Sequence, residues 1–332
     1  LLVPYSGCKD GKDMYEQYRS VRGIVAVDKE DLLEIDASSS QQVCRTFGVH
    51  KSMSVLRDLY NENDLQFFAN VGAMPRPTTK SRWQEDTKAS ELFAHNTQEK
   101  DVQTLDRTFK PLGTGIGGRM IDALSEKGFK TGSVSIAGPC FALDSKTTKT
   151  LIVPESGYPE FDPARTWTGN YSDIVMELNK ESSLGSSLYG DIWAETSIAA
   201  LNENHFLYSK YTNAELSTQF PKSSLGNQFK AISKMIKIRK ERGIERDILY
   251  AEKLNLDMHA NINAHLPTHF NEINSALKSL KEEMKAQGMW NQVNIVFVSE
   301  FGRTLQPNTA NGTDHAWGAN YFMAGGGPHG GE

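Results

Sequence analysis

The sequence lacks several features that would assign it to a common class of protein. Across its 332 residues, no apolar stretch approaches the roughly 20 residues that a membrane-spanning helix needs. There is no block of basic residues and the formal net charge is −5, so we expect no nucleic acid as the main partner. Hydrophobic residues make up 38% and charged residues 23% of the chain, which indicates a globular protein rather than a disordered one.

Cysteine is also scarce. The three cysteines, Cys8, Cys44 and Cys140, follow no spacing that is typical of a zinc site. Two interpretations stay open at this point. Either all three are small buried residues, or Cys8 and Cys44 form a disulfide and Cys140 is left over.

The length of the chain suits one large α/β domain or two ordinary ones. We expect a single domain over 1–332 that is incomplete at both ends. The first residues read as the tail of a strand, and the glycines at 325–331 are an unusual place for a domain to stop. Residues 143–187 are rich in Pro, Gly, Ser, Thr and Trp, and we expect a loop-rich insertion there.

Apolar periodicity predicts most of the secondary structure. Strands are expected at 64–72, 130–136 and 293–298, and helices at 46–61, 192–207, 225–240 and 262–287. The glycine-rich stretch at 113–124 lacks the ending of a phosphate-binding loop. We expect its glycines to allow close packing of a helix.

The strand predicted at 293–298 is followed by groups suited to metal binding. Its apolar run is typical of a buried strand in a parallel sheet. Glu300 comes directly after it, and Asp314 and His315 follow within one loop. Ligands of open α/β sheets bind beyond the carboxyl ends of strands, and divalent metals take carboxylate and imidazole ligands. The alternatives are a salt bridge from Glu300 to Arg303 and a surface position for His315.

Asp257 and His259 precede the long helix predicted at 262–287. In an extended segment, residues i and i+2 point the same way, so both side chains could face one metal. The alternative is that Asp257 caps the helix and His259 bonds to a carbonyl group. The pattern strand, helix, strand at 249–298 predicts a right-handed parallel crossover, which would bring this pair to the residues that follow the second strand.

A nucleophile is expected among Thr78, Thr79 and Ser81, where a strand gives way to a helix. A helix N-terminus favours negative charge and can hold an anionic oxygen. Arg82 could bind a phosphate or sulfate group. The alternative is an ordinary helix cap with solvated basic neighbours.

Four short motifs occur in order along the chain: Leu92-Phe93-Ala94-His95-Asn96-x-Gln98, Gly117-Gly118-Arg119-Met120, Asp257-x-His259-x-Asn261, and Ser299-Glu300-Phe301-Gly302-Arg303-Thr304 with Asn311-Gly312-x-Asp314-His315-x-Trp317-Gly318. Together they resemble the signature of the domain-of-unknown-function family 1501, within the alkaline phosphatase and sulfatase superfamily. The resemblance implies an alkaline phosphatase-like α/β fold, with a mostly parallel central sheet, helices on both faces and two metals at strand ends.

The resemblance also implies roles for single residues. The metal-binding positions match Asp257, His259, Glu300 and His315, with Asp314 beside them. Thr79 or Thr78 matches the nucleophile, and Arg82 lies near the position of an anion-binding arginine. The sequence departs from the family where Arg82 replaces a histidine of its Ser-Arg-Ser-His-Phe segment, and where an early metal-binding aspartate would precede Leu1. Many members of this family are exported, so a secreted, extracellular or periplasmic protein is expected.

Two functions follow as hypotheses. The first is a metal-dependent hydrolase of phosphate or sulfate esters, acting on a small-molecule or glycan ester with zinc, magnesium, manganese or calcium as cofactor. The alternative is a non-catalytic extracellular domain that binds a glycan or a protein. The aromatic residues in and after the expected insertion favour this alternative: Trp167, Tyr171, Tyr189 and Trp193.

Overall fold

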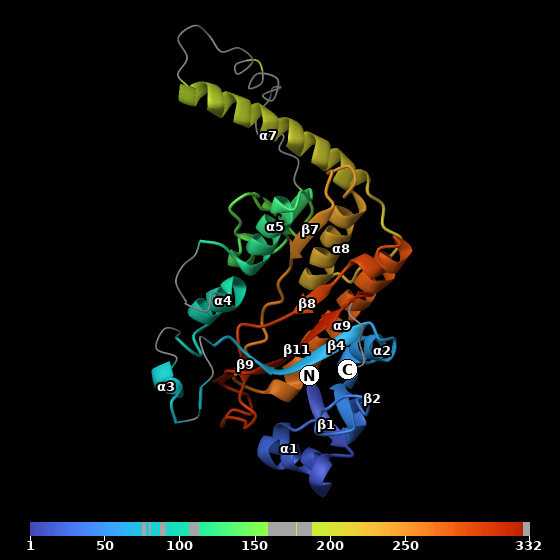
Figure 1. Ribbon diagram of the computed structural model, residues 1–332. Helices are drawn as coiled ribbons and strands as arrows, with labels where there is room; N and C mark the ends of the chain where they lie inside the picture. The colour runs from blue at the N-terminus through green and yellow to red at the C-terminus, as the bar shows by residue number, and fades with distance from the viewer. Residues whose placement is uncertain are drawn as a thin grey trace.

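The computed structural model describes residues 1–74, 78–79, 81–86, 91–105, 113–158, 177 and 188–327. It is a mixed α/β structure in which helices pack around several small sheets (Figure 1). The described helices are α1 (Met14–Arg22), α2 (Ser54–Asn61), α3 (Trp83–Asp86), α4 (His95–Thr104), α5 (Ile116–Glu126), α7 (Leu188–Asn213), α8 (Ser224–Lys237) and α9 (Ile262–Ala286). The described strands are β1 (Leu2–Ser6), β2 (Leu32–Asp36), β3 (Thr46–His50), β4 (Leu65–Val71), β5 (Thr131–Ser135), β6 (Leu151–Ile152), β7 (Arg246–Tyr250), β8 (Ile295–Phe297), β9 (Gly302–Arg303), β10 (His315–Ala316) and β11 (Ala319–Ala324).

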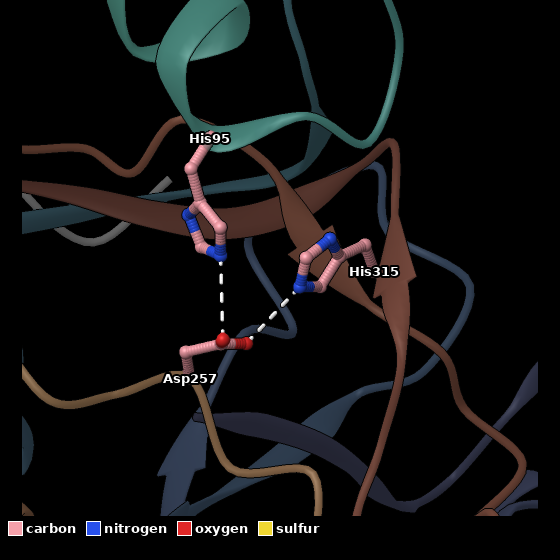
Figure 2. Close-up of side chains that lie close together, drawn as sticks. All are labelled: His95, Asp257 and His315. Atoms are coloured by element: carbon pink, nitrogen blue, oxygen red, sulfur yellow. Dashed lines mark hydrogen bonds and ion pairs between the residues drawn. The ribbon is translucent and has the colours of Figure 1, made fainter.

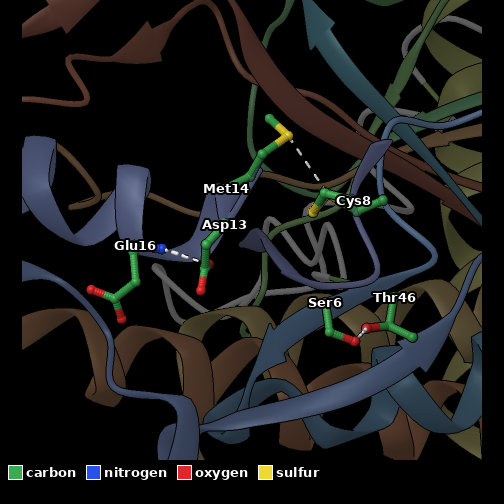
Figure 3. The surroundings of a disulfide bond; sticks show 7 residues. Ser6, Cys8, Asp13, Met14, Glu16 and Thr46 are labelled. Carbon is green, nitrogen blue, oxygen red and sulfur yellow. Dashed lines mark hydrogen bonds between the residues drawn. A yellow bond between two sulfur atoms is a disulfide. The ribbon is translucent and has the colours of Figure 1, made fainter. Parts of the chain in front are cut away.

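The N-terminal part forms an antiparallel sheet in the order β1-β3-β2. A disulfide joins Cys8, just after β1, to Cys44, just before β3 (Figure 3). Next to it, the hydroxyl groups of Ser6 and Thr46 are 2.8 Å apart. Of the two interpretations of the cysteines, the disulfide is therefore the one that the structure contains. Cys140 is free and partly buried.

The helix predicted at 46–61 is wrong in its first third. Residues Thr46–His50 form β3, the central strand of the N-terminal sheet, and only Ser54–Asn61 are helical. The physical reason is pairing on both sides: Val49 lies opposite Leu2 in β1 and Leu33 in β2. These two ladders outweigh a helical spacing of apolar residues, which a single sequence cannot distinguish from a short strand.

The main core lies around α9. Met235 of α8, together with Leu277 and Met284 of α9, is almost fully buried there. On another side of α9, the Asn274 side chain accepts a hydrogen bond of 2.8 Å from the backbone N–H of Val55 at the start of α2. The helix ends as predicted, because Gly288 adopts a left-handed conformation with φ of 67° directly after its last turn.

One sheet is parallel, with the strand order β6-β5-β7. Helix α5 packs closely against the segment that links β5 to β6, as predicted for the glycines at 113–124. A Cβ atom added to Gly118 would lie 1.7 Å from the carbonyl oxygen of Asp144, and one added to Gly115 would lie 1.9 Å from that of Phe141. Both positions therefore exclude any larger residue without movement of the backbone.

The parallel crossover predicted at 249–298 is wrong. Strand β7 pairs with β5, whereas β8 after α9 pairs antiparallel with β11 in a different sheet of order β4-β11-β8. The described residues accordingly form small sheets, and no large parallel sheet is present among them. The apolar run was misleading because Val296 is 57% and Val298 51% exposed, so one face of β8 is open, which antiparallel sheets tolerate.

The segment predicted as an insertion is described only in part. Its first residues include β6, whose Leu151 and Ile152 pair with β5 and so belong to the parallel sheet. Positions 159–176 and 178–187, with Trp167 and Tyr171, lie outside the described residues. After them comes α7, which extends away from the body of the molecule at the top of Figure 1. No helix in the described part of the chain combines the length and apolar character that crossing a membrane requires.

Candidate metal centre

Six side chains with metal-binding atoms lie together, and we call them the histidine cluster: His95, Asp257, His259, Glu300, Asp314 and His315. They come from four separate stretches of the chain. His95 begins α4, Asp257 and His259 lie between β7 and α9, Glu300 lies between β8 and β9, and Asp314 immediately precedes His315 of β10. Figure 2 shows His95 and His315 pointing toward the carboxylate of Asp257 from two directions.

Asp257 is the centre of this cluster. Its Oδ1 atom lies 3.0 Å from Nε2 of His259 and 3.1 Å from Nε2 of His315, and it also accepts a hydrogen bond from Arg303. Its Oδ2 atom lies 3.3 Å from Nε2 of His95. The two Nε2 atoms of His259 and His315 are themselves only 3.1 Å apart. One ligand atom from each of His95, Asp257 and His315 fits within a mutual separation of 4.8 Å, a spacing that a single metal ion could bridge.

The second ring nitrogen of each histidine also has a partner. Nδ1 of His95 lies 2.8 Å from Oε1 of Glu300, and Nδ1 of His259 lies 3.0 Å from Oδ1 of Asp314. Nδ1 of His315 lies 2.7 Å from the backbone carbonyl oxygen of Phe93. Each imidazole is thus fixed at both ends.

A tight turn places Asp314 and His315. The side-chain oxygen of Asn308 accepts hydrogen bonds of 3.0 Å from the backbone N–H groups of Ala310 and Gly312. Its amide nitrogen donates to Oδ1 of Asp314 at 3.0 Å and to the carbonyl oxygen of His259 at 2.9 Å. Asparagine favours such turns because its side chain can bond to the backbone two to four residues away. The turn therefore ties two parts of the cluster together.

Arg303 links the same turn to Asp257. It lies opposite His315 in the β9–β10 pair, and its Nε atom donates to the Thr313 hydroxyl at 2.9 Å. Its terminal nitrogens donate to Asp257 and to the carbonyl oxygen of Thr313. The alternative proposed from the sequence, a salt bridge from Arg303 to Glu300, is replaced by this pairing with Asp257.

An aromatic ring supports the histidines from one side. Phe301 is buried, and its ring centroid lies 4.8 Å from that of His95 and 4.5 Å from that of His315. Two of the imidazoles remain accessible to solvent, since the side chains of His95 and His259 are 45% and 47% exposed. The cluster therefore packs against Phe301 and is open to solvent at His95 and His259.

The three carboxylates of the cluster are ionised at neutral pH. Burial opposes ionisation of Asp257, but the hydrogen bond and the positive charge of Arg303 outweigh it and lower its pKa to about 2. Burial also opposes ionisation of Glu300, yet hydrogen bonds from its own backbone N–H, Ser299 and His95 lower its pKa. Hydrogen bonds from Asn308 and His259 lower the pKa of Asp314.

The structure thus brings together all five residues predicted from the sequence as metal ligands, and it excludes the alternatives for the first pair. The residue before α9 is Asn261, so Asp257 does not cap that helix. His259 bonds through its ring to Asp314 rather than to a carbonyl group. His95 was not predicted as a site residue, although the motif at 92–98 that contains it had been noticed.

The predicted catalytic residues lie in a different segment. Thr79 is exposed and its hydroxyl lies 3.1 Å from that of Ser81, while Thr78 is partly buried and Arg82 is exposed at the start of α3. This segment packs through Trp83 on Phe93, with ring centroids 6.0 Å apart, and the carbonyl oxygen of Phe93 faces Nδ1 of His315. The catalytic roles of Thr78, Thr79 and Arg82 stay predictions.

Comparison with known proteins adds one finding. Residues 235–332 match the family model described as protein of unknown function DUF1501. This range contains Asp257, His259, Glu300, Asp314 and His315, so five of the six residues of the histidine cluster lie within the matched segment. No curated protein and no solved structure shows a significant match to the chain.

Proposed function

We propose that the chain is a metal-dependent hydrolase of phosphate or sulfate esters, related to the alkaline phosphatase and sulfatase superfamily. The observation that carries this proposal is the convergence of three imidazole rings on the carboxylate of Asp257 from separate stretches of the chain. Imidazole and carboxylate groups that converge in this way are ligands that divalent metals take in proteins. The parallel sheet β6-β5-β7, which leads from β7 into the loop that carries Asp257, is consistent with this superfamily.

The donor atoms of the cluster fit a divalent metal. Imidazole nitrogen is a common ligand of zinc, whereas magnesium, manganese and calcium favour sites made of oxygen. A set rich in imidazole therefore favours zinc among the four metals expected from the sequence. When bound, the metal would polarise the ester and stabilise negative charge on its oxygens.

Side chains of the protein supply the nucleophile and the group that binds the anionic ester. We assign Thr79 as the nucleophile, because it is exposed and its segment packs through Trp83 on Phe93, whose carbonyl oxygen faces Nδ1 of His315. Arg82, three residues on and also exposed, binds the anionic oxygens of the ester. Arg303 holds Asp257 in place rather than binding the substrate, since its donors are directed at Asp257 and Thr313.

We also propose that the protein is exported. The disulfide between Cys8 and Cys44 supports this, because such bonds persist mainly in oxidising compartments outside the cytosol.

The test begins with elemental analysis of the purified protein after extensive dialysis, followed by assays with p-nitrophenyl phosphate and p-nitrophenyl sulfate. We expect His259→Ala to lose metal and hydrolysis together. Thr79→Ala should lose hydrolysis but keep the metal. The matched control Thr196→Ala should keep both, because the Thr196 hydroxyl donates to the carbonyl oxygen of Ile192 within its own helix α7, outside the histidine cluster. Full metal content with unchanged turnover in His259→Ala would exclude a metal-dependent reaction at this site.

A second candidate function is supported by α7. Tyr189 and Trp193 are 84% and 65% exposed on this helix, and exposed aromatic side chains are common in binding surfaces. A non-catalytic domain that binds a glycan or a protein through α7 would lose binding in Trp193→Ala and keep it in His259→Ala. Hydrolysis of either ester that depends on the histidine cluster would exclude this alternative.

A further inference from the structure

The tautomer of each cluster histidine follows from what its Nδ1 atom faces. The carbonyl oxygen of Phe93, 2.7 Å from Nδ1 of His315, can only accept a hydrogen bond. Carboxylates are ordinarily ionised at neutral pH, so those of Glu300 and Asp314, which face Nδ1 of His95 and His259, can also only accept. Nδ1 therefore donates a proton in all three rings, and in a neutral imidazole Nε2 is then left with an unshared electron pair.

The three Nε2 atoms all face other electron-rich atoms. Those of His259 and His315 are 3.1 Å apart, and each lies 3.0–3.1 Å from Oδ1 of Asp257. That of His95 lies 3.3 Å from Oδ2 of the same carboxylate. Three nitrogens and a carboxylate with unshared pairs repel one another at these distances unless positive charge lies among them. The guanidinium of Arg303 bonds to Asp257 and Thr313, so it leaves the three nitrogens without positive charge. One divalent cation would supply it.

We propose that a single divalent cation is bound by Nε2 of His95, His259 and His315 together with the carboxylate of Asp257. Glu300 and Asp314 do not contact it and act as positioning residues through the Nδ1–H groups of His95 and His259. This inference rests on the metal dependence of the proposed function. It differs from the sequence-based expectation in two ways: His95 becomes a ligand, and Glu300 and Asp314 cease to be ligands.

The hydrogen bonds of the two carboxylates explain this division of roles. Both oxygens of Glu300 are engaged, Oε1 by His95 and Oε2 by the Ser299 hydroxyl at 2.8 Å. Ser299 is itself held by Tyr321, whose hydroxyl donates to its carbonyl oxygen at 2.8 Å. Oδ1 of Asp314 accepts from both His259 and Asn308. Carboxylates bonded to the distal nitrogen of a metal-binding histidine fix the ring and strengthen it as a ligand.

The experiment compares His95→Ala and Glu300→Gln with the wild type, using Zn²⁺ alone as the probe. Affinity is measured by competition with a chromophoric chelator, and the number of bound imidazoles by X-ray absorption at the zinc edge. His265→Ala and Glu282→Gln are the matched controls, because both side chains are exposed on α9 and neither belongs to the cluster.

We expect one zinc ion with three imidazoles in the wild type. Glu300→Gln should keep three imidazoles and bind zinc about 10–100-fold more weakly, the usual effect of losing a group that orients a ligand. His95→Ala should keep two imidazoles and lose more affinity than Glu300→Gln. Both controls should match the wild type.

Other outcomes separate this inference from the proposed function. If Glu300→Gln loses more affinity than His95→Ala, and His95→Ala keeps the wild-type imidazole count, Glu300 is the ligand and the inference is overturned. The wild-type spectrum decides even if a variant does not fold, since two imidazoles or fewer also overturn it. Zinc bound as proposed, with neither ester hydrolysed, would retain the inference and reject the hydrolase. A wild type that binds no zinc would reject both.

Discussion

The Nδ1 atom of His95 lies 2.8 Å from Oε1 of Glu300, although the two residues are 205 positions apart in the chain. His95 is the first residue of α4, and Glu300 follows β8. This contact therefore fixes the start of a helix from the first half of the chain against a strand near its end. The same ring packs on Phe301, the next residue after Glu300.

Loss of the Arg303 guanidinium should destabilise the protein and change Asp257. In Arg303→Met, the hydrogen bonds to Asp257 and Thr313 disappear, and a charged hydrogen bond in a partly buried place contributes about 2 kcal/mol. The pKa of Asp257 should rise, because Arg303 is the main cause that lowers it. Urea unfolding measures the loss of stability, and NMR titration measures the pKa of Asp257.

The control is Arg19→Met, which removes exposed ion pairs of 3.6 and 3.9 Å. Its free energy of unfolding should change by less than about 0.5 kcal/mol. Equal effects of the two substitutions would contradict the role given to Arg303.

Gly312→Ala should weaken zinc binding without removing any ligand. A Cβ atom at this position would lie 2.1 Å from the carbonyl carbon of His259 and 2.3 Å from the backbone nitrogen of Ala260. The backbone beside His259 must then move, which displaces its imidazole. Zinc titration of Gly312→Ala should give a higher Kd than titration of Ala310→Gly, a change at an exposed position of the same turn. Equal affinities would show that the turn does not position His259.

Removal of the disulfide should lower the stability of the N-terminal sheet. The bond closes a loop between cysteines that are 36 residues apart, and such bonds contribute about 2–4 kcal/mol. Cys8→Ala with Cys44→Ala should unfold at lower urea concentration than the wild type. Dithiothreitol should lower the wild-type midpoint toward that of the double variant and leave the double variant unchanged. A wild type insensitive to the reductant under unfolding conditions would show that the bond does not form.

The stabilising effect of Asp122 should depend on pH. Hydrogen bonds from Ser145 and Thr147 to its carboxylate lower its pKa to about 2, below the value of about 3.9 for an unfolded chain. A folded pKa that is lower than the unfolded one gives stability that is complete above about pH 4 and is lost as the pH falls toward 2. The difference in urea midpoint between wild type and Asp122→Asn should therefore be largest near pH 6 and shrink below pH 4. A difference that stays constant with pH would assign it to packing instead.

The sequence predicted local features well. The long helix ending at Gly288 and the strands at 64–72 and 130–136 appear as expected, because each depends on the periodicity of neighbouring residues. The sequence also predicts the grouping of Asp257 and His259 with Asp314 and His315, on residue types that suit one kind of ligand and on a parallel crossover. The structure contains the grouping but not the crossover, because β7 and β8 lie in different sheets.

The sequence could not predict which strands pair. The residues around Val49 form a strand because β1 and β2 pair with them on either side. Strand β8 pairs with β11, which comes later in the chain. Pairing of distant strands depends on the whole fold and leaves little trace in either strand. His95 could not be predicted for the same reason, because its place in the cluster depends on contacts with Asp257 and Glu300 from the second half of the chain.

Strand β11 is the middle strand of the sheet β4-β11-β8, and this has a consequence for biosynthesis. Asn70 and Asn320, which are hydrogen-bonded across β4 and β11, are 250 residues apart. A ribosome adds about 5–20 residues per second, so β4 waits many seconds for its partner after it has been made. During that interval the edge of β4 is unpaired and prone to wrong associations. Assembly of this sheet must therefore wait until β11 has been synthesised.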